Sequence, residues 1–182
     1  HQIPNALAAA TIAYALKVST AHIATALSIH ETASKWRMEI HEGNELLLIN
    51  DCYNANPESM EAALKSLQLL TQERGGRSWA FLGTMHELGE QSPSMHRHIG
   101  EFAQELGVDH LVSIKNHDYL QGLTGNTTTK HYFESVAAAT SLFNSFEPGD
   151  VILVKASRAE HLEDLASAIT QSWSESPKNE ER

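Results

Sequence analysis

The chain lacks several features that mark common classes of protein. Cys52 is its one cysteine among 182 residues, which excludes an internal disulfide framework. No apolar run reaches the roughly 18 residues that a membrane-spanning helix needs. Lys and Arg number 13 against 23 Asp and Glu, a formal charge of −10, so general attraction to nucleic acid or anionic membranes is not expected. These features predict a soluble, cytoplasmic protein.

Phosphate-binding loops and metal-binding motifs are also missing. Gly is nowhere followed by Lys, so the G-x-x-x-x-G-K-[ST] loop is absent, and G-x-G-x-x-G does not occur. The chain therefore cannot hold a nucleoside triphosphate by itself. His96 and His98 lie two apart on an expected helix, where metal ligands need spacings of three or four. We expect no metal site built by this chain.

Residues 1–35 predict two short helices and a linker. Pro4–Leu16 is rich in Ala with apolar residues at helical spacing, and Ser19–Leu27 repeats that pattern. Two such helices cannot enclose a core, so we expect them to end a neighbouring helical domain, with 28–35 as the linker. The chain begins at His1 without Met, which we interpret as a truncated start.

Residues 36–173 alternate strands with helices. Trp36 begins an expected hairpin that leads into a buried strand at Glu45–Asn50, followed by a helix from Pro57 to about Glu73. The later elements are strand Ser78–Leu82, helix Pro93–Leu106, strand His110–Ile114, helix Phe133–Phe146, strand Val151–Val154 and helix Glu160–Trp173. The predicted fold is α/β, a Rossmann-like and mostly parallel sheet with helices on both faces. The polar residues 174–182 are expected to be a disordered tail.

The richest candidate site follows the first long strand. Asp51, Tyr53, Asn54 and Asn56 place an acid, a phenol and two amides on one strand-to-helix turn. Such groups bind ribose hydroxyls and amides, and a helix start adds free backbone N–H donors. Asn56 is also an expected helix cap. Asp51 and Asn54 could equally serve only the local backbone, and their spacing does not separate the two interpretations.

Two further loops follow strands of the expected sheet. Lys155, Ser157 and Arg158 suit an anionic phosphate or carboxylate, although an isolated basic turn with Ser157 as a helix cap is the simpler interpretation. The loop Leu82–Gly89 has glycines that permit a tight turn, but it matches no phosphate-binding motif. Because parallel strands end at one edge, all three loops are expected there.

Taken in order, these segments resemble the Mur ligase family. The matching segments are His1-x-x-x-Asn5-Ala-Leu-Ala-Ala, Arg37, Asp51-x-Tyr53-Asn54-Ala55-Asn56-Pro57-x-Ser59-Met60, Leu82-Gly83-x-Met85-x-Glu87-Leu88-Gly89 with His96 and Ile99-Gly100, and Lys155-x-Ser157-Arg158. Tyr53–Met60 is similar to the D-alanyl-D-alanine-adding branch, since other ligases of the superfamily carry a histidine-containing segment there. The resemblance covers nearly all of residues 1–172 and corresponds to the end of the central ATPase domain plus the third domain.

The resemblance implies a reaction in peptidoglycan precursor synthesis. ATP phosphorylates the carboxylate of UDP-N-acetylmuramoyl-tripeptide to an acyl phosphate, and the amine of D-alanyl-D-alanine displaces the phosphate to form an amide. Mg²⁺ accompanies ATP, and both are expected to be held mainly by an upstream part. The chain alone is therefore expected to be inactive.

The resemblance also implies roles for individual residues. The nucleotide-side residues are Asn5, Arg37, Asp51, Tyr53, Asn54 and Asn56. The residues on the dipeptide side are Lys155, Ser157 and Arg158, and Arg158 would pair with the dipeptide carboxylate. Gln2, Thr84 and Ala156 depart from the family pattern of Asn, Asp and Gly at these positions, which weakens any role expected of the Thr84 loop.

Two alternatives remain open from the sequence. The first is another amide ligase of the same superfamily that adds a different amino acid. The second is a non-catalytic Rossmann-like module that binds a small ligand at the carboxyl edge of its sheet.

Overall fold

The computed structural model describes residues 3–29 and 35–175. Contacts divide the chain into two compact units, His1–Ser34 and Lys35–Arg182, which are treated separately below. Gln2, most of the expected linker and residues 176–182 of the expected tail lie outside the described residues. Within the described part of the chain, no helix combines the length and apolarity needed to cross a membrane.

The first unit is a pair of helices, as the sequence predicts. Helix α1 spans Ile3–Ala15 and α2 spans Thr20–Ser28. Ser19 caps α2, because its hydroxyl accepts the backbone N–H of His22 at 3.3 Å. Large apolar side chains on α1 are exposed, Leu7 at 62% and Tyr14 at 66%. The unit therefore does not enclose a core among its described residues.

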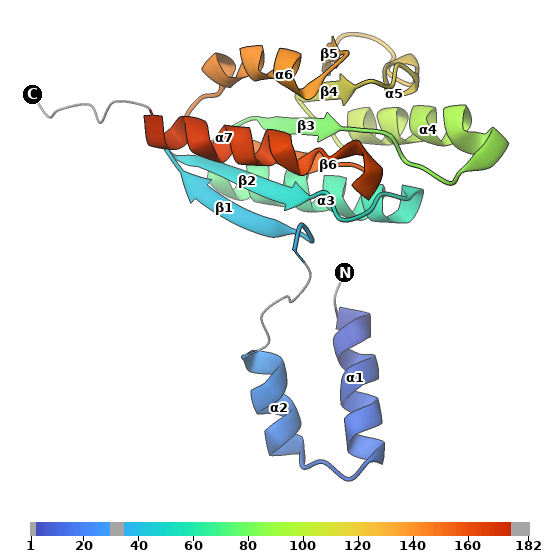
Figure 1. Cartoon of the computed structure of the whole chain (residues 1–182), viewed down its shortest axis with the longest axis vertical. Coiled ribbons are helices and arrows are strands. Elements are labelled where there is room, and N and C mark those ends of the chain that lie inside the picture. Colours follow the sequence, from blue (N-terminus) through green and yellow to red (C-terminus); the bar gives the residue numbers. More distant parts are fainter. Residues whose placement is uncertain (1–2, 30–34, 176–182) are drawn as a thin grey trace, which may run out of the picture. The chain divides into compact units, whose positions relative to one another are not determined.

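The second unit is built on one six-stranded sheet in the order β1-β2-β6-β3-β4-β5. The strands are β1 (Glu39–Gly43), β2 (Leu46–Asp51), β3 (Ser78–Leu82), β4 (His110–Ile114), β5 (Thr129–Phe133) and β6 (Val151–Lys155). Only β1 runs antiparallel to its neighbour among these strands; the other pairings are parallel. The turn between β1 and β2 places Asn44 and Glu45 at φ 50° and 62°, a geometry that suits a tight hairpin. Figure 1 shows β2, β3 and β6 pointing the same way.

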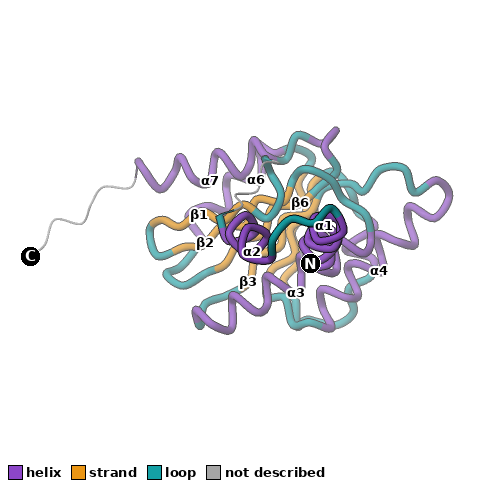
Figure 2. Tube along the Cα trace, turned by 90° about the horizontal axis from the view of Figure 1, so that it is seen from below, coloured by secondary structure: helices purple, strands orange, loops and turns teal. Residues whose placement is uncertain are grey.

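Helices cover both faces of this sheet (Figures 1 and 2). Helices α3 (Pro57–Arg74) and α4 (Ser92–Glu105) pack on one face, and α6 (Val136–Ala139) and α7 (Glu163–Glu175) on the other. Along β2, Leu47 and Ile49 enter the α3 and α4 core while Leu48 enters the α6 and α7 core. This period of two on fully buried strands confirms the predicted doubly covered sheet.

Two helices begin later in the structure than the sequence predicted. The helix expected at Phe133–Phe146 begins later, because Thr129–Phe133 is the edge strand β5, which pairs with β4. Only α6 and a 3-10 turn at Thr140–Ser145 follow it. Glu160 was expected to start the last helix, but His161 at φ 53° interrupts the chain, and α7 begins at Glu163. The short helix α5 (Asp118–Gln121) had no counterpart in the prediction.

Candidate functional site

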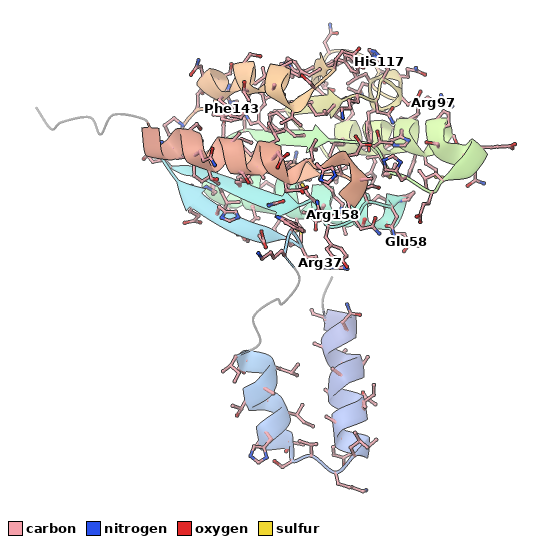
Figure 3. All side chains as sticks on the ribbon, viewed as in Figure 1. Arg37, Glu58, Arg97, His117, Phe143 and Arg158 are labelled. Atoms are coloured by element: carbon pink, nitrogen blue, oxygen red, sulfur yellow. The ribbon has the colours of Figure 1, made fainter. Side chains whose placement is uncertain are left out.

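Three loops meet at the carboxyl edge of the sheet. Asp51 ends β2 opposite Lys155 of β6, and Lys155 lies opposite Leu82 of β3. The segments after these three positions are the ones that the sequence singled out, and strand register now brings them together. Figure 3 labels Arg158, which follows β6, and Arg37, which precedes β1, at this end of the sheet.

The turn from β2 into α3 presents polar side chains on a fixed backbone. Asn56 caps α3 by accepting the N–H of Ser59 at 2.8 Å, and the Ser59 hydroxyl accepts the N–H of Asn56 at 3.1 Å. Pro57 occupies the first turn, as predicted from the sequence. Tyr53, Asn54 and Asn56 are exposed beside this helix start. The turn therefore offers a phenol and two amides to a ligand.

Asp51 and the buried Lys155 form an ion pair beneath that turn. The Lys155 ammonium donates to Oδ2 of Asp51 at 2.5 Å and to the carbonyl of Asn54 at 2.8 Å. Lys155 is 1% exposed, so it does not present its charge to solvent. Oδ1 of Asp51 accepts the backbone N–H of Met38 at 3.2 Å. Both oxygens of the acid thus have partners within the unit.

The segment before β1 lies against the same turn. The N–H of Tyr53 donates to the carbonyl of Trp36 at 2.9 Å. The Arg37 guanidinium lies 3.8 Å from the centre of the Tyr53 ring, a cation–π contact between two exposed side chains. Arg37 is therefore held beside the turn with its donors open to solvent on one side.

Arg158 lies against the same segment, over the residue that precedes Arg37. Its guanidinium lies 4.1 Å from the centre of the Trp36 ring and pairs with Oε1 of Glu163. This pairing helps lower the pKa of Glu163; burial alone would raise that pKa. Oε2 of Glu163 is buried without a hydrogen-bond partner. Trp36 and Glu163 were not predicted as site residues from the sequence, although both lie close in sequence to residues that were.

Ser157 connects two of the loops. Its hydroxyl accepts the N–H of His86 at 2.9 Å and donates to the carbonyl of Ala55 at 3.4 Å. It forms no side-chain cap on the short 3-10 turn that follows. The N–H of Ser157 also donates to the carbonyl of Thr84 at 3.1 Å, so the Thr84 loop is packed against the β6 segment.

An ion pair at the border of this edge was not expected from sequence. His86 and Glu160 lie 2.6 Å apart, and Lys115 lies 3.9 Å from the other Glu160 oxygen. The three residues follow different strands, and only strand order brings them together. Across the described residues, no group of three or more His, Cys, Asp or Glu side chains could hold a metal ion.

Asn5, the remaining predicted residue, lies on α1 of the first unit. Its side chain is exposed on that helix. The sheet-edge contacts described above are all made within the second unit, so the geometry brings together eight of the nine predicted residues: Arg37, Asp51, Tyr53, Asn54, Asn56, Lys155, Ser157 and Arg158.

Known proteins are similar to this chain in architecture and in sequence. A family model described as "Mur ligase, glutamate ligase domain" matches residues 36–158, which contain all eight of the predicted residues that meet at the sheet edge. The chain belongs to the Mur ligase family. Its Mur ligase domain is thus the unit that carries the site.

Two curated relatives carry the same name. The UDP-N-acetylmuramoyl-tripeptide--D-alanyl-D-alanine ligase of Mycobacterium tuberculosis is 38% identical over 191 residues, covering 93% of this chain and 38% of the relative. The ligase of the same name from Mycobacterium leprae is 34% identical over 190 residues, covering 93% and 36%. The chain therefore spans little more than a third of the length of these curated relatives.

A solved structure extends the similarity to the fold. MurF from Acinetobacter baumannii superposes with a TM-score of 0.83 at 31% identity, over 94% of this chain and 38% of that one. The match includes more than the residues of the family model, so it extends beyond the Mur ligase domain alone.

Proposed function

We propose that this chain is the carboxy-terminal part of a cytoplasmic, ATP-dependent amide ligase that adds D-alanyl-D-alanine to UDP-N-acetylmuramoyl-tripeptide in peptidoglycan precursor synthesis. The observation that carries the proposal is the turn after β2. Its segment Tyr53–Met60 has the residues of the D-alanyl-D-alanine-adding branch, and it presents Tyr53, Asn54 and Asn56 at an open sheet edge beside Arg37. The names of the relatives at 38% and 34% identity support the same assignment.

The nucleotide side is assigned to the turn and the segment before β1. Arg37 would neutralise phosphate charge, because its guanidinium is exposed and held on one face by Tyr53. Asn54 and Asn56 offer amides to the nucleoside, and Asn5 is assigned to the adenine on the resemblance alone. Asp51 is assigned to the ribose side, where its partly exposed carboxylate borders the turn.

The dipeptide side is assigned to the segment after β6. Arg158 is partly exposed, and its guanidinium is the group on this segment that can pair with the dipeptide carboxylate. A ligand carboxylate must compete there with Glu163, which already pairs with Arg158. Ser157 and Lys155 are assigned to this side on the resemblance, but they are 5% and 1% exposed, so neither presents its polar group to a dipeptide from the surface.

ATP and Mg²⁺ fit this chain to different degrees. The exposed Arg37 and the amides of the turn suit part of a nucleotide, whereas the sequence has no phosphate loop to grip a triphosphate. When bound, ATP supplies the phosphoryl group that activates the tripeptide carboxylate. The described residues form no metal-ion cluster, and we assign Mg²⁺ to a part of the ligase outside this chain.

Phosphate release by the full-length protein tests the proposal. With UDP-N-acetylmuramoyl-tripeptide and ATP, D-alanyl-D-alanine should give one phosphate per amide formed, while single amino acids should give none. Stoichiometric release with a single amino acid would instead favour another ligase of the superfamily. No release with any amine would favour a ligand-binding module.

A substitution then tests the dipeptide side. In the full-length enzyme, Arg158→Met should raise the KM for D-alanyl-D-alanine by about tenfold or more, since a charge-assisted contact is lost. Arg97→Met on α4, whose guanidinium lies 3.4 Å from Gln121, is the matched control and should leave that KM unchanged. The isolated chain should show no ATP-dependent amide formation, and detectable formation would contradict the proposal.

A further inference from the structure

Lys155 is a buried cation at the centre of the site. Its side chain is 2% exposed, and the residue ends a strand covered on both faces. A buried ammonium is tolerated only where partners replace its lost hydration. Its partners are Oδ2 of Asp51 and the carbonyl of Asn54, both on the turn after β2. The Lys155 ammonium therefore pairs with groups inside the protein, on the nucleotide side of the site.

The pair extends through Asp51 to the segment before β1. Oδ1 of Asp51 accepts the N–H of Met38 at 3.2 Å, and the N–H of Tyr53 donates to the carbonyl of Trp36 at 2.9 Å. These two hydrogen bonds hold the residues on either side of Arg37. Lys155 is thus linked through one carboxylate to the backbone of Met38, the residue after Arg37.

That backbone needs external support. Trp36 and Met38 have φ angles of 61° and 49°, in the left-handed region that residues with a side chain rarely adopt. Such conformations persist where surrounding contacts hold them, and they gather at functional sites. Here the supporting contacts include the N–H of Trp36 to Oε1 of Glu39 at 2.8 Å and the N–H of Met38 to Asp51.

A role in stability alone does not account for the pair. Replacing a buried ion pair with well-packed apolar side chains is often neutral or stabilising, so such a pair is weak evidence for stability. Its geometry, in contrast, fixes two separate segments with one cation: the turn through Asn54 and the Arg37 segment through Asp51.

We propose that Lys155 is a positioning residue for the nucleotide side, which acts through Asp51 and Met38 to hold Arg37 in place and does not contact the dipeptide. The inference rests on the proposed function, because Arg37 is assigned to the nucleotide there. It separates Lys155 from Arg158, although both belong to one short segment.

Kinetics of the full-length enzyme provide the test. Lys155→Met should raise the KM for ATP by about tenfold and leave the KM for D-alanyl-D-alanine within about twofold. Lys155→Arg keeps the charge and should recover part of the loss. Lys65→Met, at an exposed lysine of α3, is the matched control and should change neither KM. An unchanged KM for ATP, or a raised KM for the dipeptide, overturns the proposal.

A double-mutant cycle tests whether the effect runs through Arg37. In an Arg37→Met background, Lys155→Met should cause little further rise in the KM for ATP, because the group that it positions is gone. Fully additive effects on that KM would show that Lys155 acts independently of Arg37, and the proposal would then be wrong.

Hydrogen exchange tests the link independently of any activity. In the wild-type full-length protein, the amides of Met38 and Tyr53 should be protected, and Lys155→Met should release Met38 while the amides of β4 stay protected. Rapid exchange of Met38 in the wild type overturns the link even if the variant fails to fold. If the wild type does not ligate D-alanyl-D-alanine, the proposed function is wrong. The exchange experiment still tests the link between Lys155 and Met38, because it does not depend on ligase activity.

Discussion

The backbone N–H of Met85 donates to Nε2 of His96 at 2.9 Å. Because Nε2 accepts, the proton of the neutral ring lies on Nδ1, which is 2.6 Å from the carbonyl oxygen of Ser92. The ring also meets Tyr119 edge-on, with centroids 4.8 Å apart, and the Tyr119 hydroxyl donates to the carbonyl of Gly83 at 2.7 Å. His96 and Tyr119 thereby hold the residues on either side of Thr84, and the Met85 contact requires a neutral imidazole, because a protonated Nε2 cannot accept a hydrogen bond.

Acid should weaken the fold through this histidine. Burial lowers the pKa of His96 below its ordinary value of 6.5. Between the lowered folded pKa and 6.5, the unfolded chain binds a proton that the folded chain does not. The contribution of neutral His96 to the free energy of unfolding is therefore complete above pH 6.5. It is lost as the pH drops toward the folded pKa, by up to about 1.4 kcal/mol per pH unit.

Urea unfolding between about pH 8 and pH 5 measures this slope. Burial also lowers the pKa values of His110 and His131, so both add to the slope in the same direction. His96→Asn should flatten it, whereas His98→Gln, at a half-exposed position of the same helix, should not. A wild-type slope equal to that of His96→Asn would contradict the assignment.

Asp150 should be the costliest carboxylate to remove. It is 1% exposed, and it accepts the backbone N–H of Arg77 at 2.9 Å, the Trp79 indole at 2.8 Å and the N–H of Glu147 at 3.0 Å. Burial alone would raise its pKa, but these donors and the Arg77 guanidinium hold the pKa below its usual value.

Asp150→Ala should lower the free energy of unfolding by about 3–5 kcal/mol, because it removes a carboxylate partner of the Arg77 guanidinium and the acceptor of three N–H donors. Denaturant titration at neutral pH gives the value. Asp164→Ala, at an exposed position of α7, should cost less than about 1 kcal/mol. Equal losses in the two variants would count against a special role for Asp150.

The Tyr53 ring should matter more than its hydroxyl. If the Arg37 contact at 3.8 Å orients the guanidinium, Tyr53→Phe in the full-length ligase should keep the KM for ATP near the wild-type value. Tyr53→Leu should raise it about 2–5-fold, since an exposed cation–π pair contributes about 0.5–1 kcal/mol. Equal effects of Phe and Leu would assign the role to the hydroxyl.

Gly100 should not tolerate a methyl group. A Cβ at this position of α4 would lie 2.0 Å from the carbonyl oxygen of Tyr119, a backbone atom that cannot turn aside. Gly100→Ala should lower the free energy of unfolding by at least about 1–3 kcal/mol, as overpacking does. Gly107→Asn should cost less, because its Cβ would meet nothing within 4 Å and only the backbone strain at φ +79° remains. Thermal unfolding of both variants measures the two losses of stability.

Local signals made much of the fold predictable. Asn56 and Pro57 fix the start of α3 by their own chemistry, and continuous apolar runs identify strands covered on both faces. The edge strand β5 lacked such a signal, because Thr129–Phe133 mixes polar with aromatic residues and pairs with one neighbour only. His161 broke the last helix through a left-handed conformation that residue type alone does not reveal.

The site was predictable as a set of loops but not as a set of contacts. Parallel strands necessarily bring Asp51 and Lys155 to one edge. Their ion pair joins residues 104 apart in sequence, and it depends on the register between β2 and β6. For the same reason the sequence did not reveal that Lys155 turns inward while Arg158 meets Trp36. The ligand roles of all nine residues stay predictions.

The antiparallel direction of β1 also decides where the unit can be modified. Glu39 starts β1 opposite Asn50, at the carboxyl edge, whereas Trp173 near the end of α7 contacts Gly43 and Asn44 at the amino edge. A fluorophore or surface tether attached at the end of α7 would therefore lie on the side away from the site. The same label placed at Lys35 would sit beside Arg37, where its signal would report on ligand binding and risk blocking it.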